Sequence, residues 1–296
     1  MSSEIAVILV NYNGTNDTIE CVKSIMNSEE PADVFVVDND SSESQRIQLH
    51  KALEDLCVII DAPSNLGFSG GNNLGITKAV ELGYKYCLIL NNDTIVSKEC
   101  IGILKRECRA NRIVAPKIYN YYKKDILWAA GGFISKVTGK GKDIGEGTKD
   151  PDPGDTVLKK CSFLSGCCLM IPVSAFEKTG LFEQEYFLYY EDVDFSLKAR
   201  KNEIDLLYVP SAIIWHKDSG TSGKKSKITE YYLTRNRLHI INKYNEYFWP
   251  TAKIISYLTF YTKIMLCMLK QNPMNKVYIK AIHDYENNIT GKTELE

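Results

Sequence analysis

The stretch IAVILVNYNG, residues 5 to 14, joins six consecutive apolar residues to a polar end with two asparagines and a glycine. Units of this kind recur through the first half of the chain. Short apolar runs occupy residues 5–10, 33–38, 57–62 and 86–90, and helix-like segments follow them after Asn16, from Ser44, around 71–82 and after Ser97. Such alternation is typical of βαβ units. The sequence therefore predicts an α/β fold with a mainly parallel sheet flanked by helices.

Each of these strands ends in polar residues, which read NYNG, DNDS, APSN and NNDT in chain order. In open α/β sheets, ligands bind outside the carboxyl ends of the strands. We therefore expect the four polar ends to meet at one ligand-binding edge of the sheet.

The pattern changes after Pro116. Irregular, glycine-containing sequence follows at residues 128–133, WAAGGF, and at residues 140–155, where we expect an exposed loop. The stretch FLSGCCLMIP, residues 163–172, is strand-like and returns to the core, and a helical period begins at Ile228.

This organisation predicts two parts. Residues 1–225 would form the catalytic domain, and residues 226–296 a C-terminal helical segment that is basic and amphipathic. The basic character is local, because residues 217–280 hold twelve Lys or Arg and only three Asp or Glu.

The composition as a whole excludes some partners and favours one compartment. The net charge of -1 gives no electrostatic footprint for nucleic acid, so none is expected as a partner. Nine scattered cysteines without a C-x-x-C pair suit a reducing compartment. The first residues carry an acidic side chain and a short apolar run, which predicts a buried strand and not a signal peptide. We expect a cytoplasmic protein.

Two polar segments are candidates for nucleotide contacts. SNLGFSGGNN, residues 64–73, follows the third strand and opens a helix, so its glycines could bring backbone N–H groups close to phosphate. It is not G-x-G-x-x-G, and the alternative is a glycine turn with helix-capping asparagines. Asp38, at the end of the second strand, could accept a hydrogen bond from a nucleobase imide or could cap the next helix.

Two other strand ends suggest a metal site. Asp93, in LILNNDT, stands at the ligand edge, where a carboxylate can hold Mg²⁺ or Mn²⁺ against diphosphate oxygens. Its alternative role is an Asx turn before the helix at Ser97. His216, in IIWHKDSGTSG, ends an apolar run and is either a metal ligand or a structural histidine.

The stretch FLYYEDVDFSLKAR, residues 187–200, holds three carboxylates within four positions: Glu191, Asp192 and Asp194. Carboxylates in the first turn of a helix complement its dipole, which explains one or two of them. The helix dipole therefore leaves at least one of the three carboxylates unexplained.

Taken in order, eight stretches resemble the landmarks of glycosyltransferase family 2, and within it the rhamnosyltransferase-like members. They are LVNYNG, VVDNDS, NLGFSGGNN, LNNDT, SGCCLMI, FLYYEDVDFSLKAR, IIWHK and YYLTRN, across about residues 5 to 240. The resemblance implies a GT-A-type, Rossmann-like fold, a nucleoside-diphosphate sugar donor, a divalent metal, Mg²⁺ or Mn²⁺, and inversion at the anomeric carbon. The implied acceptor is a glycan or a lipid-linked sugar, and the transferred sugar is rhamnose or another hexose.

The resemblance also implies roles for individual residues. Asp192 would be the general base, with Glu191 positioning the acceptor or the base, and Asp194 would serve the helix or a nearby arginine. Asp93 and His216 would hold the metal. The residues implied for the donor are Tyr12, Asn13, Asp38, Asn65, Gly71, Asn72, Asn92 and Arg235, of which Arg235 could equally be a surface residue on a helix.

One position departs from the family pattern. The first acidic residue of the D-x-D motif is replaced by Asn91, and an amide oxygen is a weaker metal ligand than a carboxylate. We therefore expect weaker metal binding than a complete motif would give.

Two alternatives belong to other functional classes. A sugar-nucleotide pyrophosphorylase would need a basic, glycine-rich loop after the first strand, where this chain has NYNGTNDT. A non-catalytic nucleotide-sugar or carbohydrate-binding protein would keep the pocket without the chemistry, but Asp93, Asp192 and His216 argue against it.

The segment YFWPTAKIISYLTFYTKIMLCMLK, residues 247–270, is apolar but interrupted. Only nine uncharged residues separate Lys253 from Lys263, against the ~20 of a transmembrane helix. Lys263 and Lys270 are a heptad apart and lie on nearly one helical face. We expect this segment either to lie on an anionic membrane or to pack on the domain or on a second copy of the chain.

Overall fold

The computed structural model describes residues 3–218 and 226–295, so the expected domain boundary at residue 225 lies outside the described residues. Its strands are β1 (Ile5–Asn11), β2 (Asp33–Asp38), β3 (Val58–Asp61), β4 (Tyr86–Leu90), β5 (Thr94–Val96), β6 (Arg112–Asn120), β7 (Leu127–Ala129), β8 (Gly132–Ile134), β9 (Gly141–Asp143), β10 (Lys159–Lys160), β11 (Cys168–Pro172) and β12 (Asp205–His216). Its α-helices are α1 (Thr15–Met26), α2 (Glu43–Leu53), α3 (Gly67–Glu81), α4 (Cys100–Glu107), α5 (Val173–Thr179), α6 (Glu191–Lys201), α7 (Lys227–Lys243), α8 (Ala252–Leu269) and α9 (Met274–Glu286).

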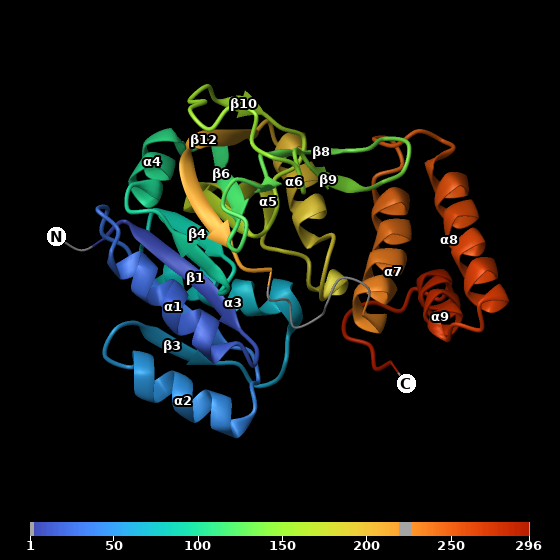
Figure 1. The fold of residues 1–296 in the computed structure, drawn as a ribbon, viewed down its shortest axis with the longest axis horizontal. Helices are drawn as coiled ribbons and strands as arrows, with labels where there is room; N and C mark the ends of the chain where they lie inside the picture. The colour runs from blue at the N-terminus through green and yellow to red at the C-terminus, as the bar shows by residue number, and fades with distance from the viewer. Residues whose placement is uncertain (1–2, 219–225, 296) are drawn as a thin grey trace.

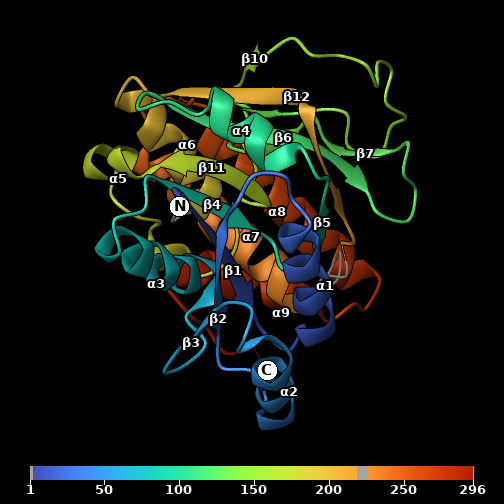
Figure 2. The same cartoon turned by 90° about the vertical axis from the view of Figure 1, so that its left-hand side faces the viewer.

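The strands build one large sheet in the order β10-β12-β6-β11-β4-β1-β2-β3 (Figure 1). The four strands β3, β2, β1 and β4 pair in parallel, and so do β6 and β12, whereas β11 runs antiparallel to β4 and β6. Helices cover both faces, with α1 and α4 on one side and α3, α5 and α6 on the other (Figure 2). The predicted α/β fold with a mainly parallel sheet is confirmed.

Strand β1 shows why its continuous apolar sequence suits the centre of this sheet. Its side chains alternate between the two faces, so Val7 and Leu9 join one core cluster while Ala6 and Ile8 join the other. All four are fully buried. A strand buried on both faces needs apolar residues at every position, which is the pattern the sequence shows.

Helix α3 lies unusually close to β1 because of two glycines one turn apart. A Cβ on Gly75 would lie 2.5 Å from Cγ2 of Ile8, and one on Gly71 would lie 2.8 Å from Cγ1 of Val10. Gly71, predicted to lie along the donor diphosphate, is thus required for packing of the helix on the sheet. The helix begins at Gly67, four residues earlier than the expected start at residue 71.

Three segments differ from the expected pattern. Strand β6 continues through Pro116 to Asn120, and the neighbouring β12 shifts register just after Val209, the partner of Pro116. A register shift accommodates a proline, which has no N–H for the ladder. The expected loop at 140–155 contains β9, which pairs with β8, and within residues 163–172 only β11 is extended.

The C-terminal helices α7, α8 and α9 stand together beside the sheet domain (Figure 1). Ile240 and Ile241 of α7 share a buried cluster with Tyr186 and Val193 of the sheet domain. The C-terminal segment is therefore helical, as expected, and α7 packs directly on the sheet domain.

Candidate active site

The loops after β1 and β2 are tied together by buried polar contacts. Asn11 donates from Nδ2 to Oδ1 of Asp38 at 2.9 Å and to Oγ of Ser41 at 3.2 Å. The backbone N–H of Ser41 donates to the other carboxylate oxygen of Asp38 at 3.3 Å. Asp38 is almost wholly buried, whereas Tyr12, beside it in sequence, is 42% exposed. The arrangement fixes Asp38 at the strand ends and leaves Tyr12 accessible to a ligand.

Asn13 strengthens the same connection. It has a left-handed backbone, with φ of 56°, a conformation that asparagine tolerates better than most residues. Its N–H donates to Ser41 Oγ at 2.9 Å, and its Oδ1 accepts from the N–H of Ser42 at 2.8 Å. In this structure, Asn13 shapes the loop on which Tyr12 is presented.

The glycine-containing loop is organised by Asn39, which the sequence analysis did not single out. Its Nδ2 donates to Oδ1 of Asn65 at 3.2 Å and to the carbonyl of Gly67 at 3.1 Å, and its Oδ1 accepts from the N–H of Leu66 at 2.9 Å. Asn72 donates to the carbonyl of Phe68 at 2.9 Å. The Oδ1 of Asn72 is buried without a partner among the described residues. A buried, unpaired amide oxygen is an available contact for a donor hydroxyl.

Gly67 connects this loop to the segment before α6. It has φ of 70°, and a Cβ there would lie 2.2 Å from the carbonyl oxygen of Phe187. The N–H of Phe68 donates to that carbonyl at 2.8 Å. Only glycine fits this approach, so the loop after β3 and the carboxylate-rich segment form one edge of the site.

Asp93 and His216 meet because β5 and β12 pair antiparallel, with Thr94 opposite His216. Nε2 of His216 lies 2.9 Å from Oδ1 of Asp93. The Trp128 ring lies edge-on to the imidazole, with centroids 4.7 Å apart. Burial lowers the pKa of His216, but the neighbouring Cys167 and Asp93 outweigh it and raise the pKa well above its ordinary value.

This pair fits a divalent cation only in part. Two ligand atoms at right angles around Mg²⁺ stand about 3 Å apart, close to the separation found here. No group of three or more His, Cys, Asp or Glu residues within 3–218 and 226–295 has a metal-binding arrangement. An ion at this pair would take its remaining ligands from diphosphate oxygens and water, as Mg²⁺ commonly does.

Asn92, predicted to contact the donor, donates to Oγ1 of Thr18 at 2.8 Å.

The carboxylates of α6 follow a strained stretch of backbone. Phe187, Tyr189 and Tyr190 all have positive φ, between 62° and 76°, which is rare for aromatic residues. Such strain persists only where the surrounding structure holds it, and it concentrates at functional sites. The strained residues directly precede Glu191 and Asp192, which lie in the first turn of α6.

Asp192 has the environment of a general base. Its Oδ2 accepts from the N–H of Gly166 at 3.0 Å, and its Oδ1 accepts from the N–H of Val193 at 2.8 Å. Burial raises the pKa of Asp192 to about 6, although these two hydrogen bonds lower it. A carboxylate with a pKa near neutrality is ionised at pH 7 and still basic enough to accept a proton.

Glu191 differs from its neighbour. It is buried, and its Oε2 has no hydrogen-bond partner among the described residues. Burial raises the pKa of Glu191 well above its ordinary value, and the charge of Asp192 adds to the effect. Burial and the charge of Asp192 both favour the protonated form of Glu191, so of these two carboxyls Asp192 is the better base.

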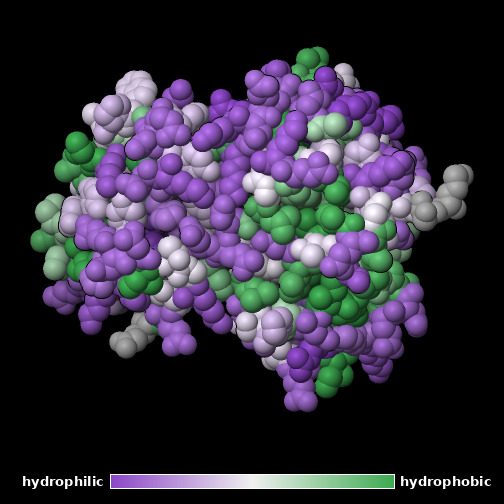
Figure 3. Space-filling view, turned by 180° about the vertical axis from the view of Figure 1, so that it is seen from behind, coloured by the Kyte–Doolittle hydropathy of each residue, from purple (hydrophilic) through white to green (hydrophobic). Residues whose placement is uncertain are grey.

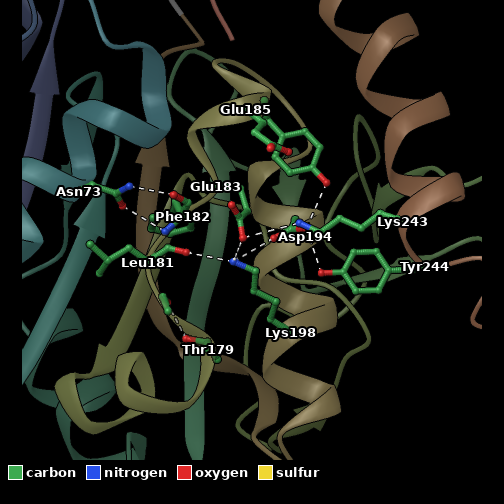
Figure 4. Close-up of polar contacts among 12 residues, drawn as sticks. Asn73, Thr179, Leu181, Phe182, Glu183, Glu185, Asp194, Lys198, Lys243 and Tyr244 are labelled. Atoms are coloured by element: carbon green, nitrogen blue, oxygen red, sulfur yellow. Dashed lines mark hydrogen bonds and ion pairs between the residues drawn. The ribbon is translucent and has the colours of Figure 1, made fainter. Parts of the chain in front are cut away.

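Asp194 is fully buried and structural. Its Oδ1 accepts from the hydroxyls of Tyr186 at 3.1 Å and Tyr244 at 2.9 Å and pairs with Nζ of Lys243 at 2.9 Å. Lys198 lies 3.3 Å from the other oxygen. Figure 4 shows Asp194 between Lys198, Lys243 and Tyr244, where it joins α6 to α7. The partners are lysines and tyrosines in place of the arginine considered from the sequence.

Arg235 lies in a setting different from the one implied by the resemblance. It is 2% exposed, and its guanidinium donates to the carbonyls of Glu185 at 3.1 Å, Tyr186 at 3.1 Å and Gly291 at 2.8 Å. Its Nε donates to Oδ1 of Asn236 at 2.9 Å. These donors hold the C-terminal segment to the sheet domain, so we do not include Arg235 in the donor site.

A further acidic residue, to which no sequence motif points, lies in the strand that packs on α6. Asp143, in β9, has a buried Oδ1 without a partner among the described residues. Burial raises the pKa of Asp143 to about 8, with the charges of Asp192 and Glu146 acting in the same direction and His216 in the opposite one. The sequence signal was weak, since GKDIGEG reads as a loop.

Comparison with known proteins links this geometry to a family. The model of glycosyl transferase family 2 matches residues 6–180. The low-salt glycan biosynthesis hexosyltransferase Agl10 of Haloferax volcanii is 29% identical over 218 residues, 70% of this chain and 64% of that protein. The N-acetylglucosaminyl-diphospho-decaprenol L-rhamnosyltransferase of Mycobacterium tuberculosis is 40% identical over 62 residues, 21% of this chain and 20% of that protein. The chain thus matches less than two thirds of the length of either relative.

A solved structure shares the fold. Mannosyltransferase PcManGT from Pyrobaculum calidifontis, determined in complex with GDP-Man and Mn²⁺, matches with a TM-score of 0.57 at 12% identity. The match covers 97% of this chain and 88% of that one. At this identity the likeness shows the fold alone, which is the GT-A arrangement.

Proposed function

This chain belongs to glycosyltransferase family 2 and is a glycosyltransferase, and we propose that it inverts the anomeric carbon of the sugar it transfers. The donor would be a nucleoside-diphosphate hexose, with rhamnose among the candidates, and the acceptor a glycan or a lipid-linked sugar. The observation that carries this proposal is Asp192, a partly buried carboxylate held by the N–H groups of Gly166 and Val193, whose pKa burial raises to about 6.

The reaction follows from the chemistry of that carboxylate. Asp192 accepts the proton of an acceptor hydroxyl while the hydroxyl oxygen forms a bond to the anomeric carbon. The bond from that carbon to the diphosphate oxygen breaks on the opposite face, and the nucleoside diphosphate leaves with the electron pair. Hydrogen bonds from Gly166 and Val193 hold the base in place. One such displacement inverts the anomeric centre.

Asp93 and His216 would hold a divalent cation, Mg²⁺ or Mn²⁺, against the diphosphate. When bound, it would neutralise charge on the leaving group. Around the nucleotide, Tyr12, Asn13 and Asp38 would line the base, and Asn65 and Asn72 the ribose and diphosphate. We keep Asn92 as a donor-side residue that would exchange its contact with Thr18 for the ligand.

The first experiment tests the donor. Nucleoside diphosphates and their sugars are screened for thermal stabilisation of the protein with and without Mn²⁺, because a ligand that binds only the folded state raises the melting temperature. A stabilising sugar nucleotide is then tested for transfer. Sugar binding without any nucleotide binding would instead support the non-catalytic alternative, and no observation on the structure favours the pyrophosphorylase.

We further propose that the acceptor is lipid-linked and that α8 lies flat on the cytoplasmic face of a membrane. Among the helices that the structure describes, α8 is the one long and apolar enough to cross a bilayer by length and composition. Its inner side, however, is packed, since Phe260 and Ile264 join a cluster with Leu238 of α7. Lys263, placed from the sequence on a basic face with Lys270, pairs with Glu230 at 2.9 Å.

The outer side of α8 is almost entirely apolar. Its exposed apolar side chains are Ile254, Leu258, Tyr261, Met265, Leu266, Met268 and Leu269, each at least 47% exposed. Most of them recur at intervals of three or four residues, which places them on one helical face. In Figure 3 hydrophobic side chains appear along the margin where α8 lies. An apolar helix face on a basic segment suits an anionic lipid surface.

A further inference from the structure

Asp143 belongs to a hairpin, residues 127–148, that packs beside the site. Residues 127–134 and 141–148 run side by side, and the backbone N–H of Leu127 donates to the carbonyl of Thr148 at 2.9 Å. At the other end, Gly132 pairs with Asp143 in the ladder of β8 and β9. Trp128, on the first arm, contacts the imidazole of His216. The hairpin therefore covers the side of the site where Asp93 and His216 meet.

The second arm of the hairpin packs on the first turn of α6. A Cβ on Gly141 would lie 2.9 Å from Cγ2 of Val193, the residue after Asp192. Side chains in a strand alternate between faces, so Asp143 projects on the same face as Gly141, toward α6. Lys142 points the other way and lies over the Phe133 ring, 5.9 Å from its centroid.

One carboxyl oxygen of Asp143 is buried without a contact that would explain its position in the part of the chain that the structure describes. Its Oδ1 is buried and makes no hydrogen bond to the described residues. Buried polar atoms are normally paired, and an unpaired one carries a desolvation cost. A ligand hydroxyl arriving at this point would supply the missing contact.

We propose that Asp143 accepts a hydrogen bond from a hydroxyl of the transferred sugar. This inference rests on the proposed function, in which Asp192 meets the acceptor oxygen and the pair of Asp93 and His216 meets the leaving diphosphate. The transferred ring lies between those two ends of the reaction. Asp143 lies on the strand that packs on Val193, next to Asp192, in the hairpin whose Trp128 contacts His216, and we infer that it faces that ring. It is a specificity-determining residue for the donor sugar.

The test compares Asp143→Asn and Asp143→Ala with Lys142→Gln, a loss of charge at an exposed position of the same strand whose side chain points away from Asp143. Titration calorimetry measures the affinity for the sugar nucleotide that stabilises the wild-type protein and for the matching nucleoside diphosphate without sugar. With Asp143→Ala we expect the sugar nucleotide to bind about 2- to 10-fold more weakly, the range for losing one hydrogen bond to an uncharged group. The nucleoside diphosphate should bind as before, and Lys142→Gln should change neither affinity.

Deoxy donors identify the hydroxyl. The wild-type protein should prefer the full donor over the analogue that lacks the contacted hydroxyl, and Asp143→Ala should lose that preference while keeping the acceptor KM. Three results for Asp143→Ala would overturn the inference. The first is an unchanged preference for the full donor, and the second is an effect confined to the acceptor KM. The third is equal weakening of nucleoside diphosphate binding, which would indicate a role at the metal. If the wild-type protein bound no sugar nucleotide, the proposed function would fail with it.

Discussion

Nε2 of His216 lies 2.9 Å from Oδ1 of Asp93, although 123 residues separate them in the chain. The contact depends on the antiparallel pairing of β5 with β12, which carries both residues to the same edge. Cys167 and Asp93 raise the pKa of His216, so a cation that binds this pair must displace a proton from the imidazole, and the metal prediction concerns these two side chains.

If Asp93 and His216 share one cation, Asp93→Ala and His216→Ala should each remove the Mn²⁺-dependent part of nucleotide binding, because a single remaining ligand holds the ion poorly. Asn91→Asp, which adds a carboxylate, should strengthen the Mn²⁺-dependent part of nucleotide binding. The measurement is nucleotide affinity by calorimetry with Mn²⁺ and with chelator. His50→Ala is the matched control, since His50 forms a similar contact with Asp61 at 3.1 Å on the surface. Full activity in excess chelator would exclude a catalytic role for metal.

Replacing Asp192 separates chemistry from binding. Asp192→Asn keeps the shape of the side chain but cannot take the proton, so turnover should fall by about 10²- to 10⁴-fold while donor affinity is kept. Glu191→Gln should act less on turnover and more on the acceptor KM, since burial and the charge of Asp192 make Glu191 the weaker candidate for the base. Steady-state kinetics with both substrates varied decides between them. Near-normal turnover of Asp192→Asn at saturating substrates would transfer the role of base to Glu191.

The pKa of Asp192, raised by burial to about 6, predicts an acid limb in the pH profile. The base must be ionised to act, so turnover should be constant above this pKa and should fall tenfold per pH unit below it. The profile is measured at saturating Mn²⁺ and donor. The residual activity of Asp192→Asn should lack the limb. A limb that survives in this variant would belong to another group.

For Asp194, the contacts seen in the structure predict a larger loss of stability on mutation than its position in the sequence does. A helix-dipole contact predicts a loss of no more than ~1 kcal/mol for Asp194→Asn. The structure shows a fully buried carboxylate with two tyrosine hydroxyls and two lysines around it. Breaking such a set removes the closer counter-charge of Lys243, which keeps Glu183 at 3.6 Å, and weakens the contacts of two buried tyrosine hydroxyls, so we expect a loss of about 2 to 4 kcal/mol. Urea unfolding measures it, with exposed Glu177→Gln as control; a loss within 0.5 kcal/mol, which is ordinary for surface changes, would contradict this.

Periodicity predicted the fold because each of the strands β1, β2 and β3 is followed by a helix, and local sequence carries that information. The pairing of Asp93 with His216 could not come from periodicity, since no local signal links residues 123 positions apart. Only resemblance to a family suggested it. Asp143 was missed because its position depends on the register of a hairpin within glycine-rich sequence. Arg235 was assigned to the donor from its motif, whereas its contacts to backbone carbonyls exist only in the folded chain.

The last prediction concerns the apolar face of α8. Met265→Glu places a charge at a position 56% exposed, so it should leave the fold intact while opposing contact with a lipid interior. We expect the wild-type chain to co-sediment with anionic liposomes at low salt and Met265→Glu to remain largely in the supernatant. Leu82→Glu, at a site 55% exposed at the end of α3, is the control and should bind like wild type. If the wild-type chain does not sediment, or if it forms a dimer in solution that Met265→Glu dissociates, this face binds a second copy of the chain and not a membrane.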